Sequence, residues 1–297
     1  MRLYLINLYR FLSEAHVVIT TAAFCQVKMI NVIFKIEDKN DIAFFVALTT
    51  FCIYNFYSVF TAFFRPENFE THRINFWRRY RYLYLYLLLS VSVILIFKYY
   101  FLFPVFFNFP RHHYLVFSIL AILSVFYGVP IFGNKSLRDL PFVKIFIIST
   151  VWAFMVVLLP VIIYSPPVSN AILGWMLIEK ICFLLAITLL CDIYDVEWDK
   201  KGNVKTIPVY FGVRATVNLI YALLIFTLVL NIYFYFENAG FSLSVLISSI
   251  LTAILSALLT SVFRKKINYL SESVFFKDGV DGLLICSWLF LIVEKYF

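Results

Sequence analysis

The chain has 297 residues, of which 63% are hydrophobic and only 14% are charged. Soluble domains carry about 25% charged residues, so the composition excludes an ordinary water-soluble core. The formal net charge of +8 does not indicate nucleic-acid binding, because the Lys and Arg residues form no soluble basic face. The composition is instead typical of a polytopic membrane protein.

Apolar stretches of about 20 residues recur along the chain and predict roughly nine transmembrane helices. The expected spans are residues 8–34, 42–63, 82–104, 114–132, 142–164, 171–191, 215–236, 240–263 and 279–297. The first is the weakest by hydropathy, and we expect it to be retained because it lacks a clear signal-peptide cleavage site. The predicted fold is all-α, a polytopic transmembrane bundle of about nine helices forming a single domain over residues 1–297.

Basic residues collect in alternate loops, after the second, fourth, sixth and eighth spans. The residues concerned are Arg65, Arg73, Arg78, Arg79 and Arg81, then Lys135, Arg138 and Lys144, then Lys200, Lys201, Lys205 and Arg214, and finally Arg264, Lys265, Lys266 and Lys277. Because such loops face the cytoplasm, the N-terminus should be cytoplasmic and the C-terminus should lie on the far side. We expect a multi-pass protein of the bacterial plasma (inner) membrane.

Charge of both signs is densest in residues 190–208, where an apolar segment ends in carboxylates and then in lysines. If the helix continues through this run, Asp192, Asp195 and Asp199 lie at i, i+3 and i+7 and share one face. Carboxylate oxygens suit Mg²⁺, which completes its shell with phosphate oxygens and water. The alternative is a capped helix end with a solvated loop, although three in-phase aspartates exceed what capping requires.

This pattern, D-x-x-D-x-x-x-D followed by K-x-x-x-x-K-T-x-P-V, resembles the second aspartate motif of the UbiA-type intramembrane aromatic prenyltransferases. The resemblance implies a cytoplasmic site in which aspartates bind the diphosphate of an isoprenoid donor through Mg²⁺. It assigns the catalytic and metal-binding roles to Asp192, Asp195 and Asp199.

A short internal match relates the end of the second span to the same motif. Residues 53–55 read Ile-Tyr-Asn and align with residues 193–195, Ile-Tyr-Asp, at an offset of 140 residues. Membrane folds are often built from two related halves, so we expect two halves here.

The first aspartate motif of the family, N-D-x-x-D-x-x-x-D, keeps only its asparagine in this chain, at Asn55. Its three acid positions are occupied by Phe56, Val59 and Phe63. The following Arg65-Pro66 resembles the R-P step of the family. Glu67 and Glu70 could replace the lost acids, although a solvated charged loop also explains them.

The segment after the fourth span, Tyr127-Gly128-Val129-Pro130 followed by Lys135 and Arg138, is similar to a Y-x-x-P…K-R element that family members place beside the donor diphosphate. Tyr127 could equally be an interfacial aromatic residue, and the bases could be topology signals. The resemblance implies a substrate-binding set of Asn55, Arg65, Tyr127, Lys135, Arg138 and Lys205.

The predicted function is Mg²⁺-dependent transfer of an isoprenoid chain from a prenyl diphosphate to an aromatic or other lipophilic acceptor. The metal and the bases would neutralise charge on the leaving group. One alternative is a degenerate, non-catalytic protein that binds an isoprenoid diphosphate or a lipid. A second is a transporter using Glu14, Lys28 and Lys180. The expected partners are donor, acceptor and membrane lipid, and no nucleic acid.

Overall fold

A computed structural model describes residues 9, 11–37, 40–64, 71–100, 111–129, 136–202, 204–237, 242–270 and 274–296. Within these ranges the chain forms helices and turns, without a strand. The predicted all-α class is therefore confirmed. The relation between two halves stays a prediction.

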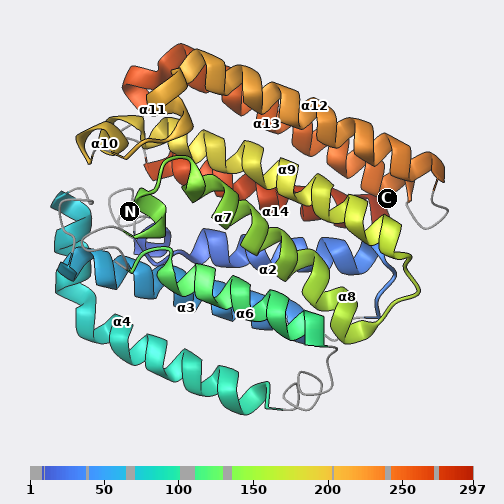
Figure 1. The fold of residues 1–297 in the computed structure, drawn as a ribbon, viewed down its shortest axis with the longest axis horizontal. Coiled ribbons are helices and arrows are strands. Elements are labelled where there is room, and N and C mark those ends of the chain that lie inside the picture. The colour runs from blue at the N-terminus through green and yellow to red at the C-terminus, as the bar shows by residue number, and fades with distance from the viewer. Residues whose placement is uncertain are drawn as a thin grey trace.

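The long helices run roughly along one direction and pack side by side (Figure 1). Their bounds are α2 (Val17–Ile33), α3 (Asp41–Phe64), α4 (Thr71–Lys98), α6 (Arg111–Phe126), α7 (Val143–Ala153), α8 (Leu159–Tyr164), α9 (Asn170–Tyr194), α12 (Val213–Glu237), α13 (Leu243–Leu270) and α14 (Val274–Tyr296). Short elements complete the set, namely η2 (Leu137–Asp139), η3 (Phe154–Leu158), α10 (Val196–Lys201) and α11 (Ile207–Phe211). Five segments of the described chain are long and apolar enough to cross a membrane, covering residues 41–64, 74–98, 143–164, 213–237 and 243–262.

Helix α2 lies at the centre of the bundle and packs against α3 and α14, while α9 packs against α7 and α12. Small side chains permit this close approach, because Ala22 and Ala23 on α2 and Ala186 on α9 are completely buried. The apolar side chains between these helices form one core cluster. The core therefore joins the start of the chain to its last helix.

The helix bounds differ from the expected spans at three places. Helix α4 begins at Thr71 and ends at Lys98, so the expected span 82–104 lies too far along the chain. Helix α6 ends at Phe126, short of the expected residue 132. The first span is interrupted at His16, whose backbone is left-handed with φ 57°, and α2 starts only after it. Hydropathy marks this span as weak, because Ser13 and Glu14 precede the break, but it does not show where one helix ends and the next begins.

The α7–α8 segment contains a π-helical turn, η3, over Phe154–Leu158. Pro160 follows directly and has no N–H to donate to the carbonyl of residue 156, so the regular hydrogen-bond ladder is interrupted here. Such turns insert an extra residue and re-aim the side chains around them. Met155 and Val156 from this turn line the large cavity described below.

Candidate functional site

A cavity with a volume of about 320 Å³ lies between α2, α3, α7, α9 and α14. Polar side chains gather on its wall around the end of α9. Apolar side chains line it further along the helices, including Ile19, Val46, Val151, Met155 and Leu184. One cavity thus combines a charged end with an apolar wall, which suits an amphipathic molecule with a charged head.

The three aspartates of the predicted motif all line this cavity. Helix α9 ends at Tyr194, but the amide of Asp195 still donates to Cys191 O at 2.9 Å and that of Asp199 donates to Asp195 O at 2.8 Å. These bonds carry the helical path into α10 and keep the three carboxylates on one side. Asp192 and Asp199 are buried, whereas the side chain of Asp195 is 36% exposed. In contrast, Glu197 is exposed and pairs with Lys200 at 3.0 Å.

Lys144 lies at the centre of the three aspartates. Its Nζ is 2.6 Å from Asp192 Oδ1, 3.7 Å from Asp199 Oδ2 and 3.8 Å from Asp195 Oδ2. The sequence pattern placed Lys144 among the loop residues that set topology, but it is the second residue of α7 and is buried against α9. A buried ammonium is stable only beside compensating charge, which these carboxylates supply.

The carboxylates lie close enough to influence one another's ionisation. Burial raises the pKa of Asp199 to about 6, although the nearby Lys144 ammonium acts in the opposite direction and lowers this pKa. Asp195 and Asp192 raise this pKa further by like-charge repulsion. The group therefore carries more negative charge than a single ammonium neutralises, and added positive charge would stabilise it.

These aspartates fit a hard divalent cation in their chemistry. Oδ2 of Asp192 and Oδ2 of Asp199 are buried and accept no hydrogen bond from the described residues, whereas Oδ1 of Asp192 pairs with the Lys144 ammonium at 2.6 Å. Oxygen donors of this kind are the ligands that Mg²⁺ prefers. In the described part of the chain, however, no three His, Cys, Asp or Glu side chains converge closely enough to hold a metal ion. The Lys144 ammonium lies within 2.6–3.8 Å of all three aspartates. A bound ion would share the carboxylates with Lys144 or displace it.

Arg138 and two tyrosines form the adjacent part of the wall. The guanidinium of Arg138 donates to the Tyr57 hydroxyl, and the rings of Tyr57 and Tyr127 lie 5.8 Å apart between centroids. All three residues line the cavity. Gly128 permits this arrangement, since a Cβ there would lie 2.0 Å from Cε2 of the Tyr57 ring. No sequence pattern pointed to Tyr57, because only the fold brings it beside Tyr127.

A capping box holds the turn that carries Arg138. Asp139 Oδ2 accepts hydrogen bonds from the backbone N and the Oγ of Ser136, both at 2.8 Å. The backbone N of Arg138 also donates to Tyr127 O at 3.0 Å. The turn η2 is thereby tied to the residue that follows α6. The Arg138 guanidinium lies close enough to Asp195 for their charges to interact.

The two remaining predicted site residues that the structure describes, Asn55 and Lys205, do not line the cavity. Asn55 is completely buried, but it is not among the described residues that line the cavity. Its Nδ2 donates to Ala15 O at 3.2 Å and to Phe51 O at 2.8 Å. Lys205 is exposed outside the cavity, although its carbonyl accepts from the Phe142 amide at 3.1 Å. Outside the described residues lie Arg65, Glu67, Glu70 and Lys135.

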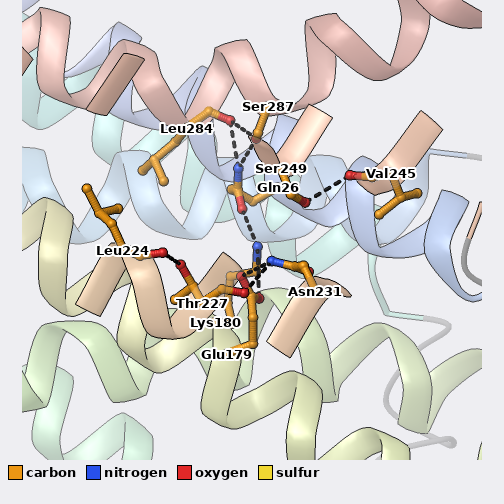
Figure 2. Close-up of polar contacts among 10 residues, drawn as sticks. All are labelled: Gln26, Glu179, Lys180, Leu224, Thr227, Asn231, Val245, Ser249, Leu284 and Ser287. Carbon is orange, nitrogen blue, oxygen red and sulfur yellow. Dashed lines mark hydrogen bonds and ion pairs between the residues drawn. The ribbon is translucent and has the colours of Figure 1, made fainter. Parts of the chain in front are cut away.

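A second polar cluster lies inside the bundle, on the first half of α9 (Figure 2). Lys180 Nζ lies 3.2 Å from Gln26 Oε1 on α2 and 3.9 Å from Glu179 Oε2. Asn231 on α12 donates to Glu179 Oε1 at 3.2 Å. Gln26 also donates to Ser287 Oγ on α14 at 2.8 Å. The cluster ties four helices together and borders a cavity of only about 20 Å³, room for one water molecule.

Comparison with known proteins was informative only at the level of structure. No protein-family model matches the chain, and no curated protein matches it in sequence. The apo structure of a UbiA homologue from Aeropyrum pernix K1 aligns with a TM-score of 0.60 at 12% identity, covering 94% of this chain and 98% of the other. A UbiA homologue from Archaeoglobus fulgidus bound to DMAPP and Mg²⁺ aligns with a TM-score of 0.52 at 14% identity, covering 95% and 99%.

A digeranylgeranylglyceryl phosphate synthase of membranes aligns with a TM-score of 0.53 at 16% identity, covering 96% of this chain and 99% of that one. The chain therefore has the fold of the UbiA-type membrane proteins over nearly its whole length. This confirms the resemblance drawn from residues 190–208 at the level of the fold.

Proposed function

We propose that this protein is a multi-pass membrane prenyltransferase, one domain over residues 1–297, that binds a prenyl diphosphate with Mg²⁺ at the end of α9. The observation that supports this most is the placement of Asp192, Asp195 and Asp199 on one wall of a cavity whose remaining lining is largely apolar. A prenyl diphosphate has a matching division, a charged head and an apolar tail.

The donor head would lie where the aspartates meet Lys144 and Arg138. Asp192, Asp195 and Asp199 would hold Mg²⁺, which when bound supplies positive charge to the departing diphosphate. Lys144 and Arg138 contribute fixed positive charge to the same oxygens, and the Tyr127 hydroxyl offers a hydrogen bond. We also propose Arg65, Lys135 and Lys205 as phosphate contacts from the neighbouring loops.

The apolar wall would hold the isoprenoid chain and exclude water. Residues that line the cavity extend along α7 and η3 from Lys144 to Val156, which corresponds to about 18 Å at the helical rise of 1.5 Å per residue. Excluding water protects an allylic cation from hydrolysis until the acceptor attacks. The lipophilic acceptor would enter from the membrane, and we propose the bacterial plasma membrane as the location.

A second candidate function is binding of the donor without turnover. The end of α3, where the first aspartate motif is degenerate, favours it. Val59 is buried against the second core cluster, and Phe56 and Phe63 are exposed, so none of the three acid positions offers a ligand. A site with fewer electrostatic stabilisers could retain the donor without ionising it, since the loss of one such group typically costs about 10²- to 10³-fold in rate.

The testing experiment uses the purified full-length protein, labelled prenyl diphosphates of several lengths and Mg²⁺. We expect Mg²⁺-dependent donor binding and diphosphate release, both lost in Asp195→Asn. The matched control is Glu197→Gln, which removes a carboxylate two residues away that is exposed and points elsewhere. Equal losses in the two variants would contradict the proposed site. Binding without release from any donor would establish the non-catalytic alternative.

A further inference from the structure

An aromatic surface lies at the end of the bundle where two membrane spans begin. The apolar segment 143–164 starts directly after Phe142, and the segment 213–237 starts two residues after Phe211, the last residue of α11. The ring centroid of Phe142 lies 5.5 Å from that of Tyr210 and 5.8 Å from that of Phe211. The rings of Tyr210 and Phe211 lie 4.8 Å apart. We refer to these three side chains as the α11 ring cluster.

The α11 ring cluster is largely exposed on the surface of the protein. Tyr210 is 65% exposed and Phe211 is 60% exposed, while Phe142 is partly buried. Neighbouring aromatic rings are a poor fit to water, because the burial of their surface is favourable. Aromatic rings are enriched where membrane helices meet the headgroup layer. The start of two spans beside these rings therefore indicates that the cluster lies in this layer.

Two backbone conformations with positive φ fix the cluster in place. Phe142 has φ 62° and ψ −11°, which is uncommon for a bulky residue. Its amide donates to the carbonyl of Lys205 at 3.1 Å, which ties the start of α7 to the segment before α11. Gly212, with φ 83°, makes the turn from α11 into α12, a conformation that glycine adopts without a steric penalty. Strained conformations persist only where surrounding contacts hold them, so the exposed rings keep a defined position.

The residues around the cluster carry an excess of positive charge. Within residues 196–214 four bases are exposed, namely Lys200, Lys201, Lys205 and Arg214. The described residues of this stretch include one exposed carboxylate, Glu197, which pairs with Lys200 at 3.0 Å. The other carboxylate, Asp199, is buried beside Lys144. Basic side chains next to a membrane span are attracted to the phosphates of anionic lipids.

The combination of rings and bases distinguishes among the molecules that could cover this surface. In a symmetric pair, a second copy of the chain would bring the same bases opposite one another, and like charges repel across an interface. A free anion would satisfy the bases but leave the rings in water. An anionic phospholipid satisfies both, since its phosphate accepts hydrogen bonds from the bases and its acyl chains contact the rings.

We propose that this surface, formed by the α11 ring cluster with Lys201 and Arg214, binds anionic phospholipid headgroups of the surrounding leaflet. The rings lie among the upper parts of the acyl chains, and the two bases contact phosphate oxygens. Lys201 Nζ also lies 4.6 Å from the centroid of the Trp198 ring. Because Trp198 and Asp199 line the large cavity, the bound lipid steadies one wall of that cavity. The lipid contact does not depend on the reaction proposed above.

The first experiment counts bound lipid. Full-length protein is purified in detergent with equal amounts of phosphatidylglycerol, which is anionic, and phosphatidylcholine, which is zwitterionic, and native mass spectrometry measures the lipids that it retains. We expect a preference for phosphatidylglycerol that falls about five-fold in Lys201→Gln and in Arg214→Gln, a change that corresponds to about 1 kcal/mol for one base near an anionic surface. The matched control is Lys35→Gln, which removes an exposed base just after the end of α2, and α2 ends far from α10 and α11 (Figure 1).

The second experiment locates the rings relative to the membrane. The native cysteines are replaced, and a nitroxide is attached to the single cysteine of Tyr210→Cys in full-length protein reconstituted into nanodiscs that contain phosphatidylglycerol. We expect the nitroxide to be more accessible to oxygen, which concentrates in the bilayer, than to a water-soluble nickel chelate.

Both bases are exposed, so Lys201→Gln and Arg214→Gln should melt at the wild-type temperature, which shows that they are folded. An equal loss of the phosphatidylglycerol preference in Lys35→Gln would overturn the proposal, as would the absence of this preference in the wild type. Greater access of the nickel chelate at position 210 would place the rings in water, and spin–spin broadening between chains would place a second copy on this surface. Either result overturns the lipid assignment.

Discussion

Lys144 shows how a single residue sets the charge of the donor site. Three carboxylates of like charge are stable together only with positive charge between them, and the Lys144 ammonium supplies it within 2.6–3.8 Å. Removing one partner from a buried ion pair leaves an uncompensated charge, which is strongly destabilising.

We therefore predict that Lys144→Met lowers the stability of the protein without ligand by about 3–5 kcal/mol, a typical cost for a broken buried pair. Added Mg²⁺ should recover part of the loss, because the ion replaces the missing positive charge among the carboxylates. Thermal unfolding in detergent, with and without Mg²⁺, measures both effects. Lys200→Met, at the exposed pair with Glu197, should leave the melting temperature unchanged. An equal shift in the two variants would contradict this role of Lys144.

Asn55 could act as a metal ligand or as the residue that holds the turn at Ala15, and a comparison of two variants separates these roles. As a metal ligand, Asn55 would be replaced well by aspartate, which offers better oxygen donors. As the residue that fixes the Ala15 turn, it acts through its N–H donors, which an ionised aspartate lacks. We predict that Asn55→Asp and Asn55→Ala reduce acceptor transfer to the same extent and leave Mg²⁺-dependent donor affinity nearly unchanged. Tighter Mg²⁺ binding by Asn55→Asp would favour the ligand role instead.

The polar cluster on α9 connects several helices of the bundle. Apolar contacts are non-directional, so they do not by themselves fix the position of one helix along another. Hydrogen bonds from Lys180, Gln26 and Asn231 give α2, α9 and α12 one mutual register (Figure 2). Polar contacts between membrane helices contribute modestly, on average about 0.6 kcal/mol, but a buried charge without a partner costs much more.

We predict that Lys180→Met and Glu179→Gln each destabilise the bundle, and that the double variant loses less than the sum of the two. The reason is that each single change leaves the other group buried beside fewer compensating partners, whereas the double change removes both charges. A double-mutant cycle on thermal stability measures this coupling, expected at about 0.5–3 kcal/mol for groups in contact. Strict additivity would show that the two residues act independently. Donor affinity should not change, since neither residue lines the large cavity.

For the whole molecule, the connections between helices lie at two opposite ends of the bundle, so the orientation of the protein in the membrane can be tested. The α10 turn and the start of α2 lie at one end of the bundle, and the turn between α8 and α9 lies at the other (Figure 1). The excess of Lys and Arg on the α10 side predicts that this end faces the cytoplasm.

We predict that a single cysteine at Gly202 is labelled by a membrane-impermeant thiol reagent only after the cells are opened, whereas one at Ser165 is labelled in intact cells. Both positions are exposed, so access to the reagent depends on the side of the membrane. The five native cysteines are free and would be replaced first. Labelling at Gly202 but not at Ser165 in intact cells would reverse the orientation.

The sequence by itself determined the all-helical membrane fold and the aspartate wall. Both are local properties, because hydropathy over about 20 residues defines a span and the i, i+3, i+7 spacing puts Asp192, Asp195 and Asp199 on one face. Only the tertiary structure decided which residues meet this wall. Lys144 and Tyr57 lie on other helices, and the turn at Ala15–His16 is contacted by Asn55, which lies 40 positions after Ala15 in the chain. Such pairings arise from helix packing, and no periodicity in one segment encodes the neighbour that another segment will bring.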